Sequence, residues 1–172
     1  AGRYIVYLKG CFPRELSLEG LKIGFDAGNG AGYFVGPQVF SELGADVVSR
    51  GVSPNGRNIN AGFGSLYPDV VRELVLEQNL DIGIALDGDA DRCIVVDDLG
   101  NVHDGDAILA VCAIDHLQRG LLPQNRVVAT VMSNLGLERA LESFGISVER
   151  AQVGDRYVLE AMQAQNISIG AE

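Results

Sequence analysis

The sequence predicts an α/β protein built from two consecutive units with mixed, mostly parallel sheets. Three observations predict this class: short apolar strands alternate with helical patterns, the connections are long enough for crossovers, and one hairpin interrupts the alternation. That hairpin, near residues 93–102, divides the chain into units at 1–100 and 101–172. The second unit has only three strand candidates, so we expect it to be C-terminally truncated.

The elements of the first unit follow from apolar periodicity and from the residues that begin or end helices. Gly44 closes the first helix, and Pro68 and Asp69 mark the first turn of the next one. The expected elements are, in order, a strand at 21–25, a glycine-rich turn at 26–32, a helix at 33–43, a strand at 45–48, a loop at 51–67, a helix after Pro68, a strand at 80–86 and a hairpin of 93–96 with Val102.

The second unit continues the alternation of helix and strand. Gly120 and Gly145 follow the ends of two of its helices, where a residue free to adopt positive φ is favoured. The expected elements are a helix at 106–119, a strand at 126–132, a helix at 135–144, a strand at 147–152, a helix at 156–165 and the start of a strand at 167–169.

Charge and hydropathy exclude two classes of partner. The chain has 13 Lys and Arg against 23 Asp and Glu, a formal net charge of −10, without a basic run. This composition argues against nucleic acid or an anionic membrane surface as the main partner. The longest apolar run, residues 108–114, is far shorter than the ~18 residues of a membrane span. The N-terminus lacks signal-peptide organisation, so a cytoplasmic location is expected.

The cysteines and histidines indicate no catalytic arrangement. Cys93 and Cys112 lie in apolar stretches, where buried, reduced thiols are expected. His103 and His116 are isolated, without a nearby serine or cysteine arrangement that suggests a catalytic triad, and are expected at the surface.

The strongest chemical feature is a run of alternating acidic residues. Asp87, Asp89 and Asp91 follow the apolar strand at 80–86, at the strand end where open α/β sheets place ligands. Three carboxylates so close together repel one another unless a cation neutralises them, and oxygen ligands favour Mg²⁺, Mn²⁺ or Ca²⁺ over zinc. Arg92, next in the chain, suits either contact with phosphate oxygens or a salt bridge that balances the acidic loop.

Two other motifs compete for these residues. A phosphatase with Asp87 as a nucleophile, forming a phosphoaspartate, is the first alternative, although Asp91 and Arg92 fit that scheme poorly. An EF-hand loop needs glycine at its sixth position and usually glutamate at its twelfth, where this chain has Arg92 and Asp98.

The remaining motifs are less specific. Gly28, Gly30 and Gly32 depart from the spacing of a dinucleotide fingerprint, so their loop is interpreted as a tight turn rather than an anion site. The polar loop at 54–60 could line a site or cap strand ends. Residues 104–106 and 154–157 are expected to open helices, and the second of these motifs could also contact a substrate.

Together these residues resemble the α-D-phosphohexomutase superfamily and, within it, the phosphoglucosamine mutase branch. The resemblance covers essentially the whole chain, in order. Residues 58–60 and 132–134 point to the glucosamine branch, and Ala90 stands where many members have glycine. The matching stretches are 21–31, 54–60, 86–92, 104–106, 132–137 and 153–158.

The resemblance implies the second domain and most of the third domain of a four-domain isomerase. That enzyme interconverts glucosamine 6-phosphate and glucosamine 1-phosphate, a step towards cell-wall precursors, through a phosphoserine and a sugar bisphosphate. The implied site residues are Asp87, Asp89 and Asp91 as Mg²⁺ ligands, Arg92 as the catalytic arginine, Glu172 as a sugar-hydroxyl ligand and Arg156 as a further substrate contact.

The resemblance also implies parts that this chain does not contain. None of its serines has the Ser-His-Asn-Pro context of the phosphoserine, and the C-terminal phosphate-binding loop is missing. The expected partners are therefore a phosphorylated amino sugar and the N- and C-terminal domains of the same polypeptide, and the chain alone is expected to be inactive. A non-catalytic metal or sugar-phosphate binding module is the alternative outside the enzymes.

Overall fold

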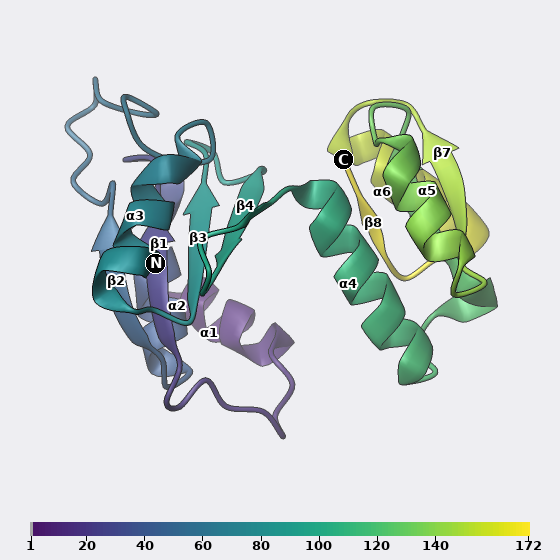
Figure 1. Ribbon diagram of the computed structural model, residues 1–172, viewed down its shortest axis with the longest axis horizontal. Coiled ribbons are helices and arrows are strands. Elements are labelled where there is room, and N and C mark those ends of the chain that lie inside the picture. The colour runs from purple at the N-terminus through teal and green to yellow at the C-terminus, as the bar shows by residue number, and fades with distance from the viewer. Residues whose placement is uncertain (1) are drawn as a thin grey trace. The chain divides into compact units, whose positions relative to one another are not determined.

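The computed structural model describes residues 2–172, which form two compact units, one that ends at His103 and one at Asp104–Glu172 (Figure 1). The sequence placed the boundary after residue 100. The structure places it after His103, because residues 102 and 103 pair with the preceding strand and so belong to the first sheet. Among residues 2–172, no helix has both the length and the apolar character needed to cross a membrane.

The first unit contains a mixed five-stranded sheet in the order β2-β1-β3-β4-β5. Strand β1 runs parallel to β2 and β3, whereas β4 is antiparallel to both β3 and β5. The strands are β1 (Lys22–Asp26), β2 (Asp46–Arg50), β3 (Ile82–Leu86), β4 (Cys93–Asp97) and β5 (Val102–His103), and the helices are α1 (Gly2–Cys11), the 3₁₀ turn η1 (Ala31–Tyr33), α2 (Val35–Glu42) and α3 (Pro68–Gln78).

Helices α2 and α3 pack on opposite faces of this sheet. Phe25 of β1 packs on Phe40 of α2, with 5.9 Å between the ring centroids. Its neighbour Gly24 faces Leu74 of α3 and Leu80. Because successive strand residues point to opposite faces, the two helices enclose the sheet between them. Because β1 and β3 are parallel, both strands end at the same edge of the sheet. Asp26 lies at the end of β1 there, and Asp87 directly follows β3.

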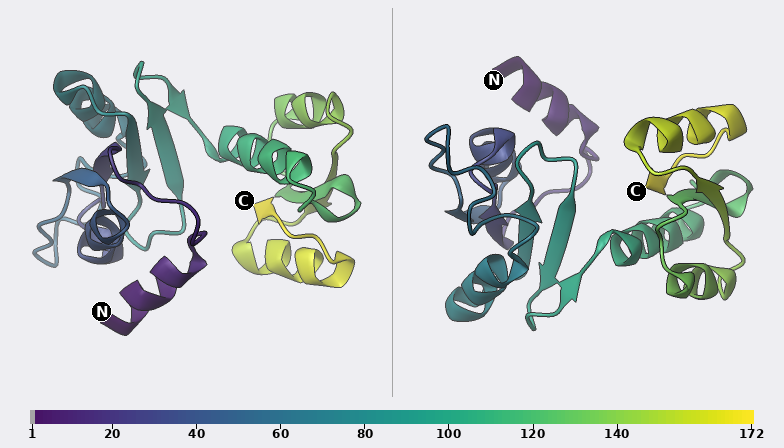
Figure 2. Two further views of the ribbon diagram at one scale, coloured as in Figure 1. Left: turned by 90° about the horizontal axis from the view of Figure 1, so that it is seen from below. Right: turned by 90° about the horizontal axis from the view of Figure 1, so that it is seen from above.

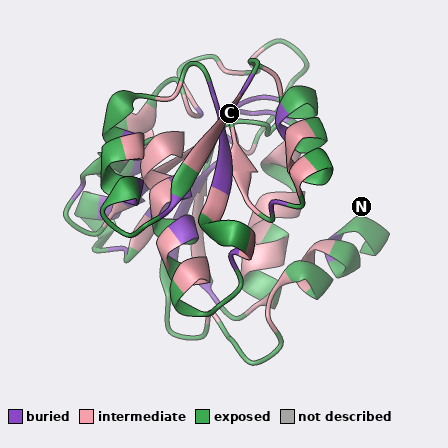
Figure 3. Ribbon diagram, turned by 90° about the vertical axis from the view of Figure 1, so that its right-hand side faces the viewer, coloured by how far each residue is buried: buried purple, intermediate pink, exposed green. Residues whose placement is uncertain are grey.

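The second unit is a parallel three-stranded sheet in the order β7-β6-β8, with two apolar cores. On β6, Val127 and Ala129 join the core that includes α4 and α5 residues, whereas Val128 joins the core beside α6. The buried central strand and the more exposed helices are visible in Figure 3, and Figure 2 gives two further views. The elements are α4 (Gly105–Gln118), the 3₁₀ turn η2 (Pro123–Asn125), β6 (Arg126–Thr130), α5 (Leu135–Glu142), β7 (Ser147–Ala151), α6 (Asp155–Gln165) and β8 (Gly170–Ala171).

The α/β class and the alternation of elements are confirmed, and two elements differ from the prediction. Helix α1 was not among the expected elements, and the last strand lies at Gly170–Ala171 rather than at 167–169. Ile167 is buried in the core beside α6. The apolar residue that suggested a strand therefore reflects burial of the segment before the strand.

The prediction of buried cysteines is wrong. Cys93 and Cys112 are both exposed, as is Cys11. Cys93 is the first residue of β4, where the strand leaves the acidic loop. Helix α4 is apolar on several sides, and Cys112 lies next to the exposed Val111, whereas Leu109 and Ala113 are buried. An apolar stretch therefore did not identify which of its residues face the core.

A network of hydrogen bonds to Asp97 holds the hairpin between β4 and β5. Its carboxylate accepts hydrogen bonds from the backbone N–H groups of Leu99 (3.1 Å) and Asn101 (2.7 Å), and from the Asn101 side chain (2.9 Å). His103 Nε2 lies 3.1 Å from Asp97 Oδ2, so this half-buried histidine is a hairpin contact rather than a free surface residue. The Asn101 bonds are the main cause that lowers the pKa of Asp97 to about 2.

This lowered pKa predicts acid sensitivity of the first unit. Because the folded pKa lies below the ordinary value of 3.8, the Asp97 contribution to stability is complete above pH 4 and disappears as the pH falls towards 2. We expect Asp97→Asn to lower the free energy of unfolding at pH 7, and the difference from the unchanged chain to shrink below pH 4. Urea unfolding across this pH range measures the difference in the free energy of unfolding. Asp98→Asn, at an exposed neighbour, is the control, and an equal loss in both variants would contradict the assignment.

Candidate metal centre

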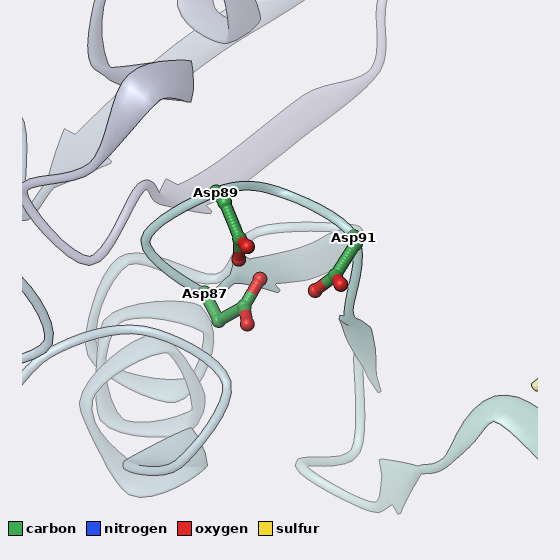
Figure 4. A group of neighbouring side chains, drawn as sticks. All are labelled: Asp87, Asp89 and Asp91. Atoms are coloured by element: carbon green, nitrogen blue, oxygen red, sulfur yellow. The ribbon is translucent and has the colours of Figure 1, made fainter. Parts of the chain in front are cut away.

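The acidic residues lie in the loop that joins β3 to β4. Leu86 and Cys93 pair across the base of this loop, and the Ala90 N–H donates to the Asp87 carbonyl (3.2 Å). These contacts curl residues 87–92, which we call the metal loop, so that carboxylate oxygens of Asp87, Asp89 and Asp91 all lie within 4.8 Å of one another (Figure 4). A loop between two strands also rules out the EF-hand alternative, which requires flanking helices.

The three carboxylates form an electrostatically unfavourable group by themselves. Asp87 is buried, whereas Asp89 and Asp91 are exposed. Partial desolvation raises the pKa of Asp91, and the negative charges of Asp87 and Asp89 raise it further. An all-oxygen donor set with concentrated negative charge suits a hard divalent cation, which would relieve the repulsion.

Arg92 contacts the same acidic group. Its Nε lies 3.0 Å from Asp87 Oδ2 and 3.7 Å from Asp91 Oδ1, and its backbone N–H donates to Asp87 Oδ1 (3.2 Å). The side chain is nevertheless 68% exposed. Arg92 therefore forms the salt bridge considered from the sequence while its guanidinium stays accessible to an anion.

The glycine-rich turn after β1 supports the metal loop and does not form an anion site. The Ala31 N–H donates to the Gly88 carbonyl (2.7 Å), and a Cβ on Gly30 would lie only 2.2 Å from that oxygen. Only glycine permits this close approach at position 30. The N–H groups of residues 28, 29 and 30 donate to Asp26, to the Gly51 carbonyl and to the Ala27 carbonyl. The donors of the turn are thus used within the protein.

Asp26 is a buried acid that the sequence analysis did not single out. Its carboxylate accepts hydrogen bonds from the N–H groups of Gly28 (2.8 Å) and Gly64 (2.7 Å), which ties the turn to the loop at 51–67. Burial raises its pKa, and the two hydrogen bonds oppose that rise. The sequence signal that could have identified Asp26 is its position at the end of an apolar strand.

The predicted sugar-binding residues lie in the second unit, at or near the carboxyl edge of its sheet. Glu172 is exposed and directly follows β8, and its carbonyl lies 3.5 Å from a Cβ placed on Gly105 at the start of α4. The Arg156 side chain is 83% exposed, and its Nε contacts Glu160 at 2.7 Å within α6. The structure shows no contact between Glu172 and Arg156.

Two helix starts at the same edge are linked to each other. Asp104 caps α4 by accepting a hydrogen bond from the Ala107 N–H (3.0 Å), as the sequence predicted for a helix start. Asp106 accepts from the backbone and the side chain of Asn134, both at 2.8 Å. Asn134 in turn caps α5 through the Leu137 N–H (3.1 Å). The motifs at 104–106 and 132–137 therefore order this edge of the sheet.

Both units match models of one protein family. Residues 2–100 match phosphoglucomutase/phosphomannomutase alpha/beta/alpha domain II, and residues 104–172 match domain III. The chain is 54% identical to the phosphoglucosamine mutase of Citrifermentans bemidjiense and 57% identical to that of Sorangium cellulosum, over 99% of its length in each case. It spans only 38% and 36% of those two relatives.

Solved structures show the same fold at lower sequence identity. A phosphoglucomutase/phosphomannomutase family protein from Burkholderia thailandensis superposes with a TM-score of 0.81 at 23% identity, over 98% of this chain and 36% of its own. An N-acetylglucosamine-phosphate mutase, described as a member of the α-D-phosphohexomutase superfamily, superposes with a TM-score of 0.63 at 20% identity, over 97% of this chain and 38% of its own.

The backbone at Ala90 generates a prediction about stability. Ala90 is exposed and has φ of 65°, in the left-handed region that costs a residue with a Cβ roughly 1–2 kcal/mol. Glycine loses more entropy on folding, by roughly 0.5–1 kcal/mol. We expect Ala90→Gly to raise the free energy of unfolding by up to about 1 kcal/mol, measured by urea denaturation. Ala61 is exposed and has no positive φ, so Ala61→Gly should lower the free energy of unfolding. Equal effects of the two substitutions would contradict backbone strain at Ala90.

Proposed function

The chain belongs to the phosphoglucomutase/phosphomannomutase family as a homologue of phosphoglucosamine mutases, and from this premise we propose that it carries the metal centre of such an isomerase. The reaction proposed is the interconversion of glucosamine 6-phosphate and glucosamine 1-phosphate, in the cytoplasm. The observation that carries the proposal is the convergence of three carboxylates within 4.8 Å at the end of β3.

In this proposal Asp87, Asp89 and Asp91 hold Mg²⁺, whose chemistry is to neutralise charge on a phosphoryl group during transfer. The all-oxygen donor set and the short separations among the three carboxylates support this choice of ion. The catalytic role of Arg92 rests on its accessible guanidinium, which is oriented by Asp87 through Nε and can offer its remaining N–H donors to phosphate oxygens.

The second unit is proposed to bind the sugar. Glu172 would accept hydrogen bonds from sugar hydroxyls, and Arg156 would contact the substrate after release from Glu160. The phosphoserine and the loop that binds the second phosphate would come from other domains of the polypeptide. This distribution of the site over several domains agrees with the span of the chain, which covers little more than a third of the mutases that it matches.

The phosphatase alternative is disfavoured by the surroundings of Asp87. One of its carboxylate oxygens accepts the Arg92 N–H and the other contacts Arg92 Nε, and the side chain is 4% exposed. A nucleophilic aspartate needs an oxygen that can reach a phosphorus atom. Asp87 therefore suits a ligand that organises the loop better than a group that is phosphorylated.

The metal assignment predicts the effect of removing one ligand charge. We expect Asp89→Asn to lower the affinity for Mg²⁺ or Mn²⁺ on the order of tenfold or more, because an anionic ligand is lost from an exposed position where the fold does not depend on it. Isothermal calorimetry on the chain measures the affinity. Glu77→Gln, on the exposed side of α3, removes the same charge elsewhere and should have no effect. Unchanged binding by Asp89→Asn would refute the site.

The assignment of Arg92 predicts a separation of turnover from metal binding. In a full-length phosphoglucosamine mutase containing this segment, Arg92→Lys should lower kcat more than metal affinity, because lysine lacks the rigid, forked guanidinium. Steady-state kinetics with a coupled assay for glucosamine 1-phosphate, beside metal titration, test this. Arg119→Lys, in an exposed pair on the second unit, is the control. Near-normal turnover in Arg92→Lys would leave Arg92 with the salt-bridge role alone.

A further inference from the structure

Gly88 is the point at which two distant segments contact the metal loop. From one direction, residues 30 and 31 hold its carbonyl through the Ala31 N–H. From another, the loop at 54–60 approaches its Cα. A Cβ on Gly88 would lie 2.5 Å from Ile59 Cδ1 and 3.1 Å from Asn60 Nδ2. Gly88 lies between Asp87 and Asp89 in the chain, so a displacement of its backbone shifts the positions of both carboxylates.

Asn60 has a left-handed backbone beside Gly88. Its φ is 57°, and its backbone N–H donates to the Gly28 carbonyl (2.8 Å). Its side-chain oxygen is buried without a hydrogen-bond partner in the structure, 2.9 Å from a Cβ placed on Gly28 and 3.5 Å from one placed on Gly64. The carboxamide therefore fills the space between three glycines that belong to three different loops.

A buried amide oxygen without a partner destabilises the fold, and a left-handed backbone is adopted more readily by glycine than by asparagine. Both features are explained if the side chain is retained for what it contacts, since unfavourable local features persist where the surrounding structure or the function requires them.

We propose that Asn60, with Ile59 beside it, is a positioning residue of the metal centre. The carboxamide packs against Gly88 and keeps the metal loop against residues 30 and 31. It thereby opposes the mutual repulsion that would move Asp87 and Asp89 apart before a cation binds. The inference rests on the proposed metal-binding function, and it assigns the motif at 58–60 to the site through packing rather than through contact with an ion.

The test replaces the side chain and keeps the backbone conformation. Asn60→Gly permits φ of 57° and removes the side chain, including the carboxamide. The matched control is Asn79→Gly, at another left-handed asparagine (φ 51°) that ends α3 in the same unit. Titration of each chain with Mn²⁺, followed by electron paramagnetic resonance of the free ion, gives the affinity, and thermal unfolding without metal gives the stability.

We expect Asn60→Gly to weaken Mn²⁺ binding about tenfold, a typical effect of changing a residue that supports metal ligands, while Asn79→Gly binds as the unchanged chain does. A purely structural role would lower the melting temperature without changing the affinity of the folded protein. Unchanged affinity in folded Asn60→Gly overturns this inference alone. Absence of Mn²⁺ binding by the unchanged chain overturns the proposed metal function and this inference together.

A second pair of variants covers the case in which Asn60→Gly does not fold. Gly88 has no positive φ, so Gly88→Ala changes only the space at the contact. The added methyl group should displace the metal loop from Ile59 and weaken Mn²⁺ binding. Ile59→Ala in the same chain removes the overlapping atoms and should restore part of the affinity. Failure of Gly88→Ala to weaken binding, or the absence of any recovery in the double variant, would overturn the proposal.

Discussion

Repulsion among three carboxylates at the end of β3 is the constraint to which the first unit is adapted. Asp87, Asp89 and Asp91 lie within 4.8 Å of one another, and neighbouring negative charge contributes to the raised pKa of Asp91. The loop that carries them is short and is itself closed by backbone hydrogen bonds. Its position depends on contacts from the turn after β1 and from the loop at 54–60. These two segments are joined by the hydrogen bond from the Asn60 N–H to the Gly28 carbonyl, and Asp26 ties the turn to Gly64.

Features that depend on neighbouring residues in the chain were predictable from the sequence. The strands near 21–25 and 80–86, the glycines that follow helices and the alternating acids all have local signals, and the structure has them within a residue or two. Helix α1 lacks such a signal. Its residues Tyr4, Val6 and Tyr7 are exposed, and Ile5 is its one described buried residue, so no apolar stripe of helical period marks it.

Features that depend on distant segments were not predictable in this way. The tight turn at 26–32 was expected, but its partner Gly88 was not, because the contact follows from the pairing of β1 with β3. The burial of Asp26 and the position of Asn60 have the same origin. The exposure of Cys93 and Cys112 also follows from packing, since the composition of a segment does not specify which of its sides is covered.

The backbone contact between Gly30 and Gly88 has a consequence for the order of folding. The two glycines are far apart in the chain and lie in the loops that follow the parallel strands β1 and β3, which are joined by a long crossover that includes α2, β2 and α3. Closing such a loop costs entropy before any contact is gained, so contacts of this kind form late. The acidic loop can curl locally as soon as β3 and β4 pair. Its final shape, however, requires β1 to be in place beside β3, so the arrangement of the three carboxylates is one of the last features that the first unit acquires as it folds.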